Sequence, residues 1–169
     1  MNDITNLADT VKPKSDQLNA DDLLTGPINV TVINVKRGSN DQPVVIEIAG
    51  MMPYKPCKSM RRVLISAWGQ NGADWIGKSM TLFNDPSVKF GGVALGGIRI
   101  SHVSHIKNAM AMMLTTTRSK RAQCVIQPMI VDHSEVIKKY FSLQEIGQKK
   151  MWEKLQPDQQ TAIINAAKQ

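Results

Sequence analysis

The chain has 169 residues, of which 42% are hydrophobic and 21% charged, with a net charge of +7 and a pI of about 9.5. This composition is typical of a globular protein with a real core and excludes a wholly disordered chain. There is no apolar run near the roughly 18 residues of a membrane span, no signal-peptide pattern at the start and no cysteine spacing that favours disulfides, so we expect a cytoplasmic protein without membrane contact.

The first expected elements are strands. Residues 1–24 are polar and without periodicity, so we expect a flexible arm. Residues 28–38, INVTVINVKRG, are rich in β-branched side chains and predict a strand, whose apolar phase shifts at Ile33 and so indicates a bulge or burial on both faces. VVIEI at 44–48 predicts a second strand, and residues 54–58 a short third strand that flanking prolines confine to an edge.

The period then changes to that of a helix. Ser59 is a plausible N-cap, and the apolar residues that follow at helical spacing are Met60, Val63, Leu64, Ala67 and Trp68. After a Gly-rich break, the alternation around Met80 and Leu82 predicts a fourth strand. A hairpin-like loop over residues 84–92 leads to a fifth strand at 93–100.

Three strands, a helix and two strands are the layout of an OB-fold, a small barrel whose face and loops bind oligonucleotides. We therefore predict a mainly β fold with α: an OB-fold-like five-stranded Greek-key barrel with a helix between strands 3 and 4. Residues 109–117 and 122–131 predict an added β-hairpin with a cationic tip, and the chain turns helical from residue 132. The expected domains are 1–24, 25–131 and 132–169.

Positive charge is concentrated in the central part of the chain. Six aspartates precede residue 42, whereas residues 50–131 hold eleven cations and two anions, a net charge of +9. Such a segment is typical of a surface that binds a polyanion, because each neutralised phosphate releases counterions. A generally basic, solvated surface is the alternative.

The start of the predicted helix carries the densest group of cations, which is Lys55, Lys58, Arg61 and Arg62. Cations in a first helical turn oppose the helix dipole at a cost of about 0.3–1 kcal/mol each where exposed. A bound anion would compensate this cost, so we interpret the group as the rim of a groove for a phosphate backbone. A solvated helix start is the alternative interpretation.

The full set of candidate nucleic-acid-binding residues is Tyr54, Lys55, Lys58, Arg61, Arg62, Lys78, Lys89, Phe90, Arg99, Arg118, Lys120 and Arg121. Base stacking contributes on the order of 1–3 kcal/mol per base, and we expect Tyr54 and Phe90 to be exposed for it. Trp68 and Trp75 are at core-like positions and are expected to be buried. With 5% aromatic residues in the chain, phosphate contacts should dominate binding.

The sequence offers no recognisable catalytic set. There is no Ser/His/Asp or Cys/His arrangement, no GxGxxG fingerprint and no P-loop. His102 and His105 would point to opposite faces of a continuing strand and so could not share an ion. We therefore expect no enzymatic activity, no cofactor and no metal. The methionines around the added hairpin either fill the core or form an oligomer contact. The sequence therefore leaves open whether the chain forms a homo-oligomer.

Residues 74–102, DWIGKSMTLFNDPSVKFGGVALGGIRISH, resemble phage- and prophage-encoded proteins of replication and recombination modules, and the resemblance extends over residues 23–128. It implies an OB-like barrel and a role similar to that of phage single-stranded-DNA-binding proteins, in the cytoplasm of the bacterial host. Partners would be single-stranded DNA and replication or recombination proteins of phage or host.

The resemblance supplies no catalytic residues. The chain also lacks one feature that is common among single-stranded-DNA-binding proteins. Many of these end in an acidic tail that recruits partners, whereas this chain ends IINAAKQ. The alternative function is that of an accessory or inhibitory phage protein, which would bind a host or phage protein through the same basic face.

Overall fold

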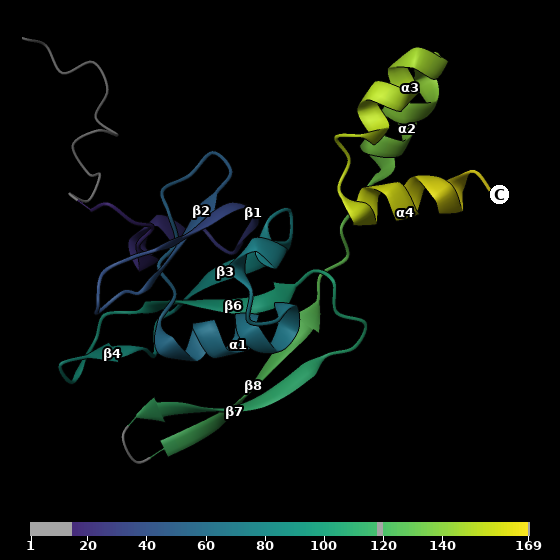
Figure 1. Ribbon diagram of the computed structural model, residues 1–169. Coiled ribbons are helices and arrows are strands. Elements are labelled where there is room, and N and C mark those ends of the chain that lie inside the picture. The colour runs from purple at the N-terminus through teal and green to yellow at the C-terminus, as the bar shows by residue number, and fades with distance from the viewer. Residues whose placement is uncertain (1–14, 118–119, 169) are drawn as a thin grey trace, which may run out of the picture. The chain divides into compact units, whose positions relative to one another are not determined.

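The computed structural model describes residues 15–117 and 120–168, which form two compact units that divide between Met129 and Ile130. The first unit holds an open six-stranded sheet and one α-helix, and the second holds three α-helices (Figure 1). The fold is therefore mainly β with α, as the sequence predicts.

The sheet has the strand order β2-β1-β3-β6-β8-β7. These strands are β1 (Ile28–Arg37), β2 (Val44–Ile48), β3 (Ser79–Asp85), β6 (Gly97–Val103), β7 (Met110–Thr117) and β8 (Lys120–Pro128). Neighbouring strands are antiparallel except β6 and β8, which are parallel and pair through two residue pairs at the ends of both strands.

The long strand β1 belongs to two pairings. Its first half pairs with β3 and its second half with β2, and the register shifts between Val32 and Asn34. Val32 is buried while Ile33, inside the shift, is 53% exposed. The predicted bulge is confirmed, and it lets one strand serve two neighbours.

The predicted closed barrel is not formed, because the sheet is open and ends at β2 and β7. The expected third strand at 54–58 is reduced to one bridge, in which Ile46 and Tyr54 exchange backbone hydrogen bonds of 2.9 and 2.8 Å. Pro53 and Pro56 lie on either side and lack the N–H groups that a longer ladder needs.

Helix α1 (Lys58–Trp68) lies against β6 and β7 (Figure 1). The predicted stripe is confirmed, with buried side chains at Met60, Val63, Leu64 and Trp68. Trp68 is 5% and Trp75 3% exposed, and their indole N–H groups donate to the carbonyls of Ser104 and Gly69 at 2.8 and 3.0 Å. Both indoles are core residues, as expected.

Residues 15–24, which the sequence predicts to belong to a flexible arm, pack against the rest of the first unit. Leu18 and Leu23 are buried in the core, the latter within a 3-10 helix, η2 (Ala20–Leu23). Residues 15–24 therefore belong to the folded unit, because two apolar anchors in a polar stretch suffice to fix it. The prediction for residues 1–14 falls outside the described part of the chain.

Two smaller regions complete the structure. The predicted loop before β6 contains a short hairpin of β4 (Lys89–Phe90) and β5 (Val93–Ala94). The second unit consists of α2 (Ser134–Ser142), α3 (Glu145–Trp152) and α4 (Pro157–Ala166), in the segment predicted to be helical. None of the helices in the described residues has the length and apolarity to cross a membrane.

Candidate nucleic-acid interface

A cavity of about 620 Å³ lies where the segment before α1 faces the start of β6. Within the described residues these two segments form no strand pairing, because the expected third strand is reduced to the Ile46–Tyr54 bridge. Its walls come from residues 17–21, from residues 54–59 around the start of α1, from the foot of the β4–β5 hairpin, from residues 95–99, and from Thr115 of β7.

Four of the predicted phosphate-binding cations line this cavity: Lys55, Lys58, Lys89 and Arg99. They are far apart in the sequence and come from the segment before α1, from α1 itself, from β4 and from β6. The fold therefore concentrates charge that the sequence distributes over a long stretch.

Arg99 is held in the wall of the cavity. Its Nε lies 3.8 Å from Asp85 Oδ2 and its Nη1 donates to the Cys57 sulfur at 3.5 Å. The side chain is 19% exposed. Because sulfur is a weak acceptor and the carboxylate is distant, the guanidinium keeps capacity for a stronger partner.

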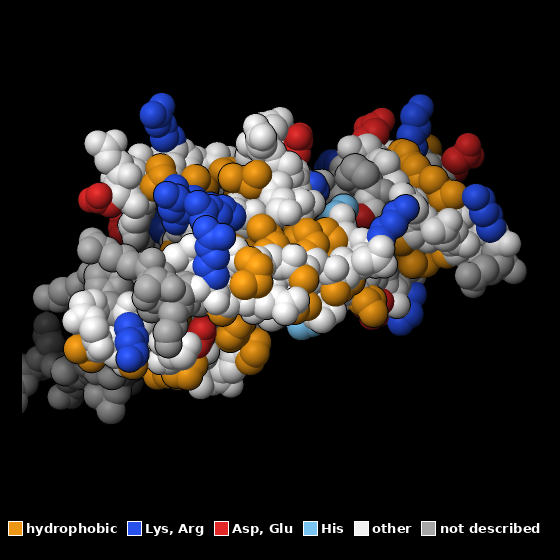
Figure 2. Space-filling model, turned by 90° about the horizontal axis from the view of Figure 1, so that it is seen from below, with side chains coloured by type: hydrophobic (Ala, Val, Ile, Leu, Met, Phe, Trp, Pro, Cys, Tyr) orange, Lys and Arg blue, Asp and Glu red, His pale blue; other side chains and the backbone are white. Residues whose placement is uncertain are grey.

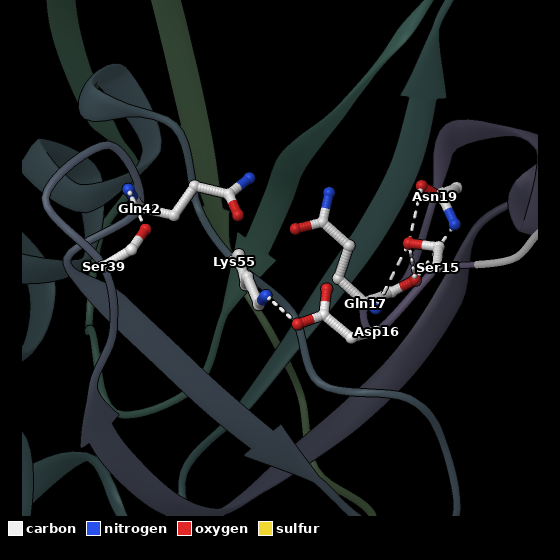
Figure 3. Close-up of polar contacts among 7 residues, drawn as sticks. All are labelled: Ser15, Asp16, Gln17, Asn19, Ser39, Gln42 and Lys55. Carbon is white, nitrogen blue, oxygen red and sulfur yellow. Dashed lines mark hydrogen bonds and ion pairs between the residues drawn. The ribbon is translucent and has the colours of Figure 1, made fainter.

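Lys55 is not a free cation. Its Nζ donates to Asp16 Oδ2 at 2.7 Å, and its side chain is 13% exposed. Figure 3 shows Lys55 between the loop that carries Ser39 and Gln42 and the N-terminal segment that carries Asp16 and Gln17. The hydrogen bond and the charge of Lys55 lower the pKa of Asp16. The predicted role of Lys55 in the groove therefore requires that Asp16 release it.

The start of α1 is joined to the β7–β8 hairpin. The Ser59 hydroxyl donates to the carbonyl oxygen of Thr115 at 3.4 Å, and Thr115 pairs with Arg121 across the hairpin. Arg62 follows Ser59 by one helical turn and is exposed, as are Lys58 and Arg121. The hairpin thus brings a further cation beside the helix start. We call Lys58, Arg62, Lys89, Arg99 and Arg121 the basic face.

Figure 2, which views the molecule from the side of the β7–β8 hairpin, shows Lys and Arg side chains gathered in a group beside hydrophobic side chains. On the β7–β8 hairpin, Met113 is 62% and Val125 45% exposed. Charge and apolar surface therefore adjoin on this side of the molecule.

Two predicted cations differ from this group. Lys78 lies 5.9 Å from the ring centroid of Trp68, the last residue of α1, so it is at the opposite end of the helix from Lys58. An 11-residue helix is about 16 Å long. Lys78 therefore lies about one helix length from the cations at the start of α1. Arg61 is half-buried, and its Nε has no hydrogen-bond partner within residues 15–117 and 120–168.

The expectation that Tyr54 offers an exposed stacking face is wrong. The bridge to Ile46 turns the side chain inward, and the residue is 2% exposed. Its hydroxyl has no hydrogen-bond partner among the residues described, and burial raises the pKa of Tyr54. Tyr54 is therefore a wall residue of the cavity, not a platform for bases.

Three predicted residues cannot be placed in the site. Arg118 lies outside the described residues, and the side chains of Phe90 and Lys120 do as well. The sequence in turn gave no reason to consider Cys57, the exposed N-cap residue of α1, or Asp16. The apolar Leu18 in a polar stretch, two residues after Asp16, is the signal that could have suggested a contact from the N-terminal segment.

No protein-family model, curated protein or solved structure matches the chain. What it binds is therefore inferred from its own residues.

Proposed function

We propose that the protein binds single-stranded DNA without catalysing a reaction, with the phosphate backbone following the basic face. The observation that carries this proposal is the convergence of cations from α1, β4 and β6 on one cavity, with Arg121 brought beside it by the Ser59–Thr115 contact. Three carboxylates oppose these cations within the described residues: Asp21 lines the cavity, Asp16 contacts Lys55, and Asp85 lies 3.8 Å from the Arg99 Nε.

The order of the elements supports single strands as the ligand. A strand β1 that pairs with two neighbours, a helix between β2 and β3, and a short hairpin between β3 and β6 are features similar to those of the OB-fold. Proteins of that type bind single strands through a charged groove beside protruding loops. The β4–β5 hairpin, which carries Lys89 and Phe90, would be such a loop.

Phosphate contacts would dominate the affinity. Each contact to a single strand contributes about −0.7 to the slope of log affinity against log salt, so five cations give a slope of up to about −3.5. Lys55 is left out of this count because Asp16 neutralises it. The resemblance to phage proteins adds a biological setting to the proposal, namely replication or recombination of phage DNA.

The test is a titration of fluorescent oligo-dT by anisotropy over a salt series, with a duplex of the same length in parallel. We expect preferential binding of the single strand and a slope between about −2 and −3.5. Equal affinity for duplex, or a slope near zero, would contradict the proposal.

A protein partner is the second candidate function, favoured by the exposed Met113 and Val125 beside Arg121 on the hairpin. Exposed apolar residues next to charge are typical of protein interfaces. The two functions separate in the same titration, since a protein-binding module would leave the oligonucleotide free at about 50 mM salt, where phosphate contacts are strong.

A further inference from the structure

We infer that the cavity at the start of α1 is a binding site for one phosphate group, held by the first amides of α1, the Arg99 guanidinium and the Tyr54 hydroxyl. The inference deepens the proposed function and rests on it: the group would be one fixed phosphate of the bound strand, while the other cations of the basic face make replaceable contacts.

The amino end of α1 lacks the usual internal compensation. Its N-cap residue, Cys57, makes no side-chain capping bond, and the first turn contains no acidic residue. The Ser59 hydroxyl in the first turn donates to the Thr115 carbonyl oxygen. The first N–H groups of the helix and its positive dipole end are thus left for an external acceptor.

Tyr54 gives an independent indication of a ligand. It lines the same cavity and is 2% exposed, yet its hydroxyl has no partner among the residues described. Buried tyrosine hydroxyls normally find a partner, because an unsatisfied one loses its hydration without replacement. A phosphate oxygen is an acceptor that this donor could use.

Arg99 supplies the charge. Its guanidinium lies beside the Cys57 sulfur at 3.5 Å and Asp85 at 3.8 Å, and both Arg99 and Cys57 are close enough to Tyr54 to influence its hydroxyl. Tyr54, Cys57 and Arg99 all line the cavity. Asp21 in the cavity wall and Asp85 beside Arg99 are acidic groups that oppose an anion here.

The combination of backbone amides, a planar guanidinium and a phenol fits phosphate oxygens better than a carboxylate, because three different donors can each take a separate oxygen. The phosphate could come from a DNA strand or from a free phosphate compound. The experiment therefore has one arm for each source.

The first arm is a titration of the 15N-labelled protein with inorganic phosphate, followed by NMR. We expect the amide signals of Lys58, Ser59 and Met60 to shift with saturation, whereas sodium chloride at equal ionic strength leaves them in place. The second arm measures oligo-dT affinity by anisotropy for the same variants.

The variants are Tyr54→Phe, Cys57→Asp and, as a matched control, Cys57→Ala. Tyr54→Phe should weaken phosphate binding roughly ten- to a hundredfold, the loss of one hydrogen bond to an anion, without lowering the melting temperature. Cys57→Asp places a capping carboxylate on the same amides, so it should raise the melting temperature and abolish the phosphate shifts. Cys57→Ala should keep them.

The outcomes separate this inference from the proposed function. Phosphate shifts that spare residues 58–60, or unchanged phosphate affinity in both Tyr54→Phe and Cys57→Asp, would overturn the phosphate site even if oligo-dT binds normally. Shifts at these amides with no binding of oligo-dT would keep the site and overturn the proposed function, leaving a small phosphorylated compound as the ligand.

Discussion

Removing three exposed cations of the basic face should change the salt dependence of DNA binding by a calculable amount. The variant replaces Lys58, Arg62 and Arg121 with glutamine. If each contacts one phosphate, the slope of log affinity against log salt becomes shallower by about 2. Between about 50 and 200 mM salt, the ratio of wild-type to variant affinity should therefore shrink by roughly 20-fold.

The fold should survive this substitution. All three side chains are exposed, and exposed substitutions usually change the free energy of unfolding by about 0.5 kcal/mol or less. Two of the residues lie in the first turns of α1, where a cation opposes the helix dipole, so their neutralisation should if anything stabilise the helix. Thermal melting of the variant checks that any loss of binding is not a loss of structure.

The matched control removes the same charge elsewhere, with Lys149, Lys150 and Lys154 of the second unit replaced by glutamine. The assay is anisotropy of labelled oligo-dT at several salt concentrations for all three proteins. A folded triple variant with the wild-type slope would refute the placement of the phosphate backbone on the basic face. An equal loss in the control would show that net charge, rather than this face, determines binding.

Three further changes test separate parts of the structure. Asp16→Asn should free the Lys55 ammonium and steepen the salt slope by about 0.7, and an unchanged slope in the anisotropy assay would mean that Lys55 stays covered. Tyr54→Phe removes a buried hydroxyl without a described partner, so urea unfolding without ligand should show a gain of about 1 kcal/mol, and a loss of that size would point to a partner for the hydroxyl. Ile46→Ala deletes a fully buried side chain at the Tyr54 bridge and should cost about 2–5 kcal/mol in the same measurement, with a smaller cost showing that the core collapses around the gap.

The local features of the fold could be predicted because neighbouring residues determine them. The spacing of Met60, Val63 and Leu64 predicts which side of α1 is buried, and the phase shift at Ile33 predicts the bulge in β1. Both depend on the periodicity of one element, which a sequence displays directly.

The parts that could not be predicted depend on segments that meet only in space. Tyr54, between two prolines, has the pattern of an exposed edge, and its burial follows from the bridge to Ile46. The sequence predicts Lys55 to be a free cation. In the structure, the buried Leu18 anchors the segment that places Asp16 in contact with Lys55. For the same reason the cations of the candidate site could be named from the sequence, whereas their gathering around one cavity could not.

The uneven attachment of the β7–β8 hairpin has a consequence for how a ligand would be held. Two residue pairs and the Met129–Val103 hydrogen bond of 2.8 Å fix the root of the hairpin to β6, while near its tip the Ser59–Thr115 bond is longer, at 3.4 Å. Between these two points Leu114 of β7 is buried in the core, so the Ser59–Thr115 contact is the outermost one described between β7 and α1. Because Arg121 pairs with Thr115, we expect loss of the Ser59 hydroxyl to speed the release of a bound strand more than it lowers the stability of the fold.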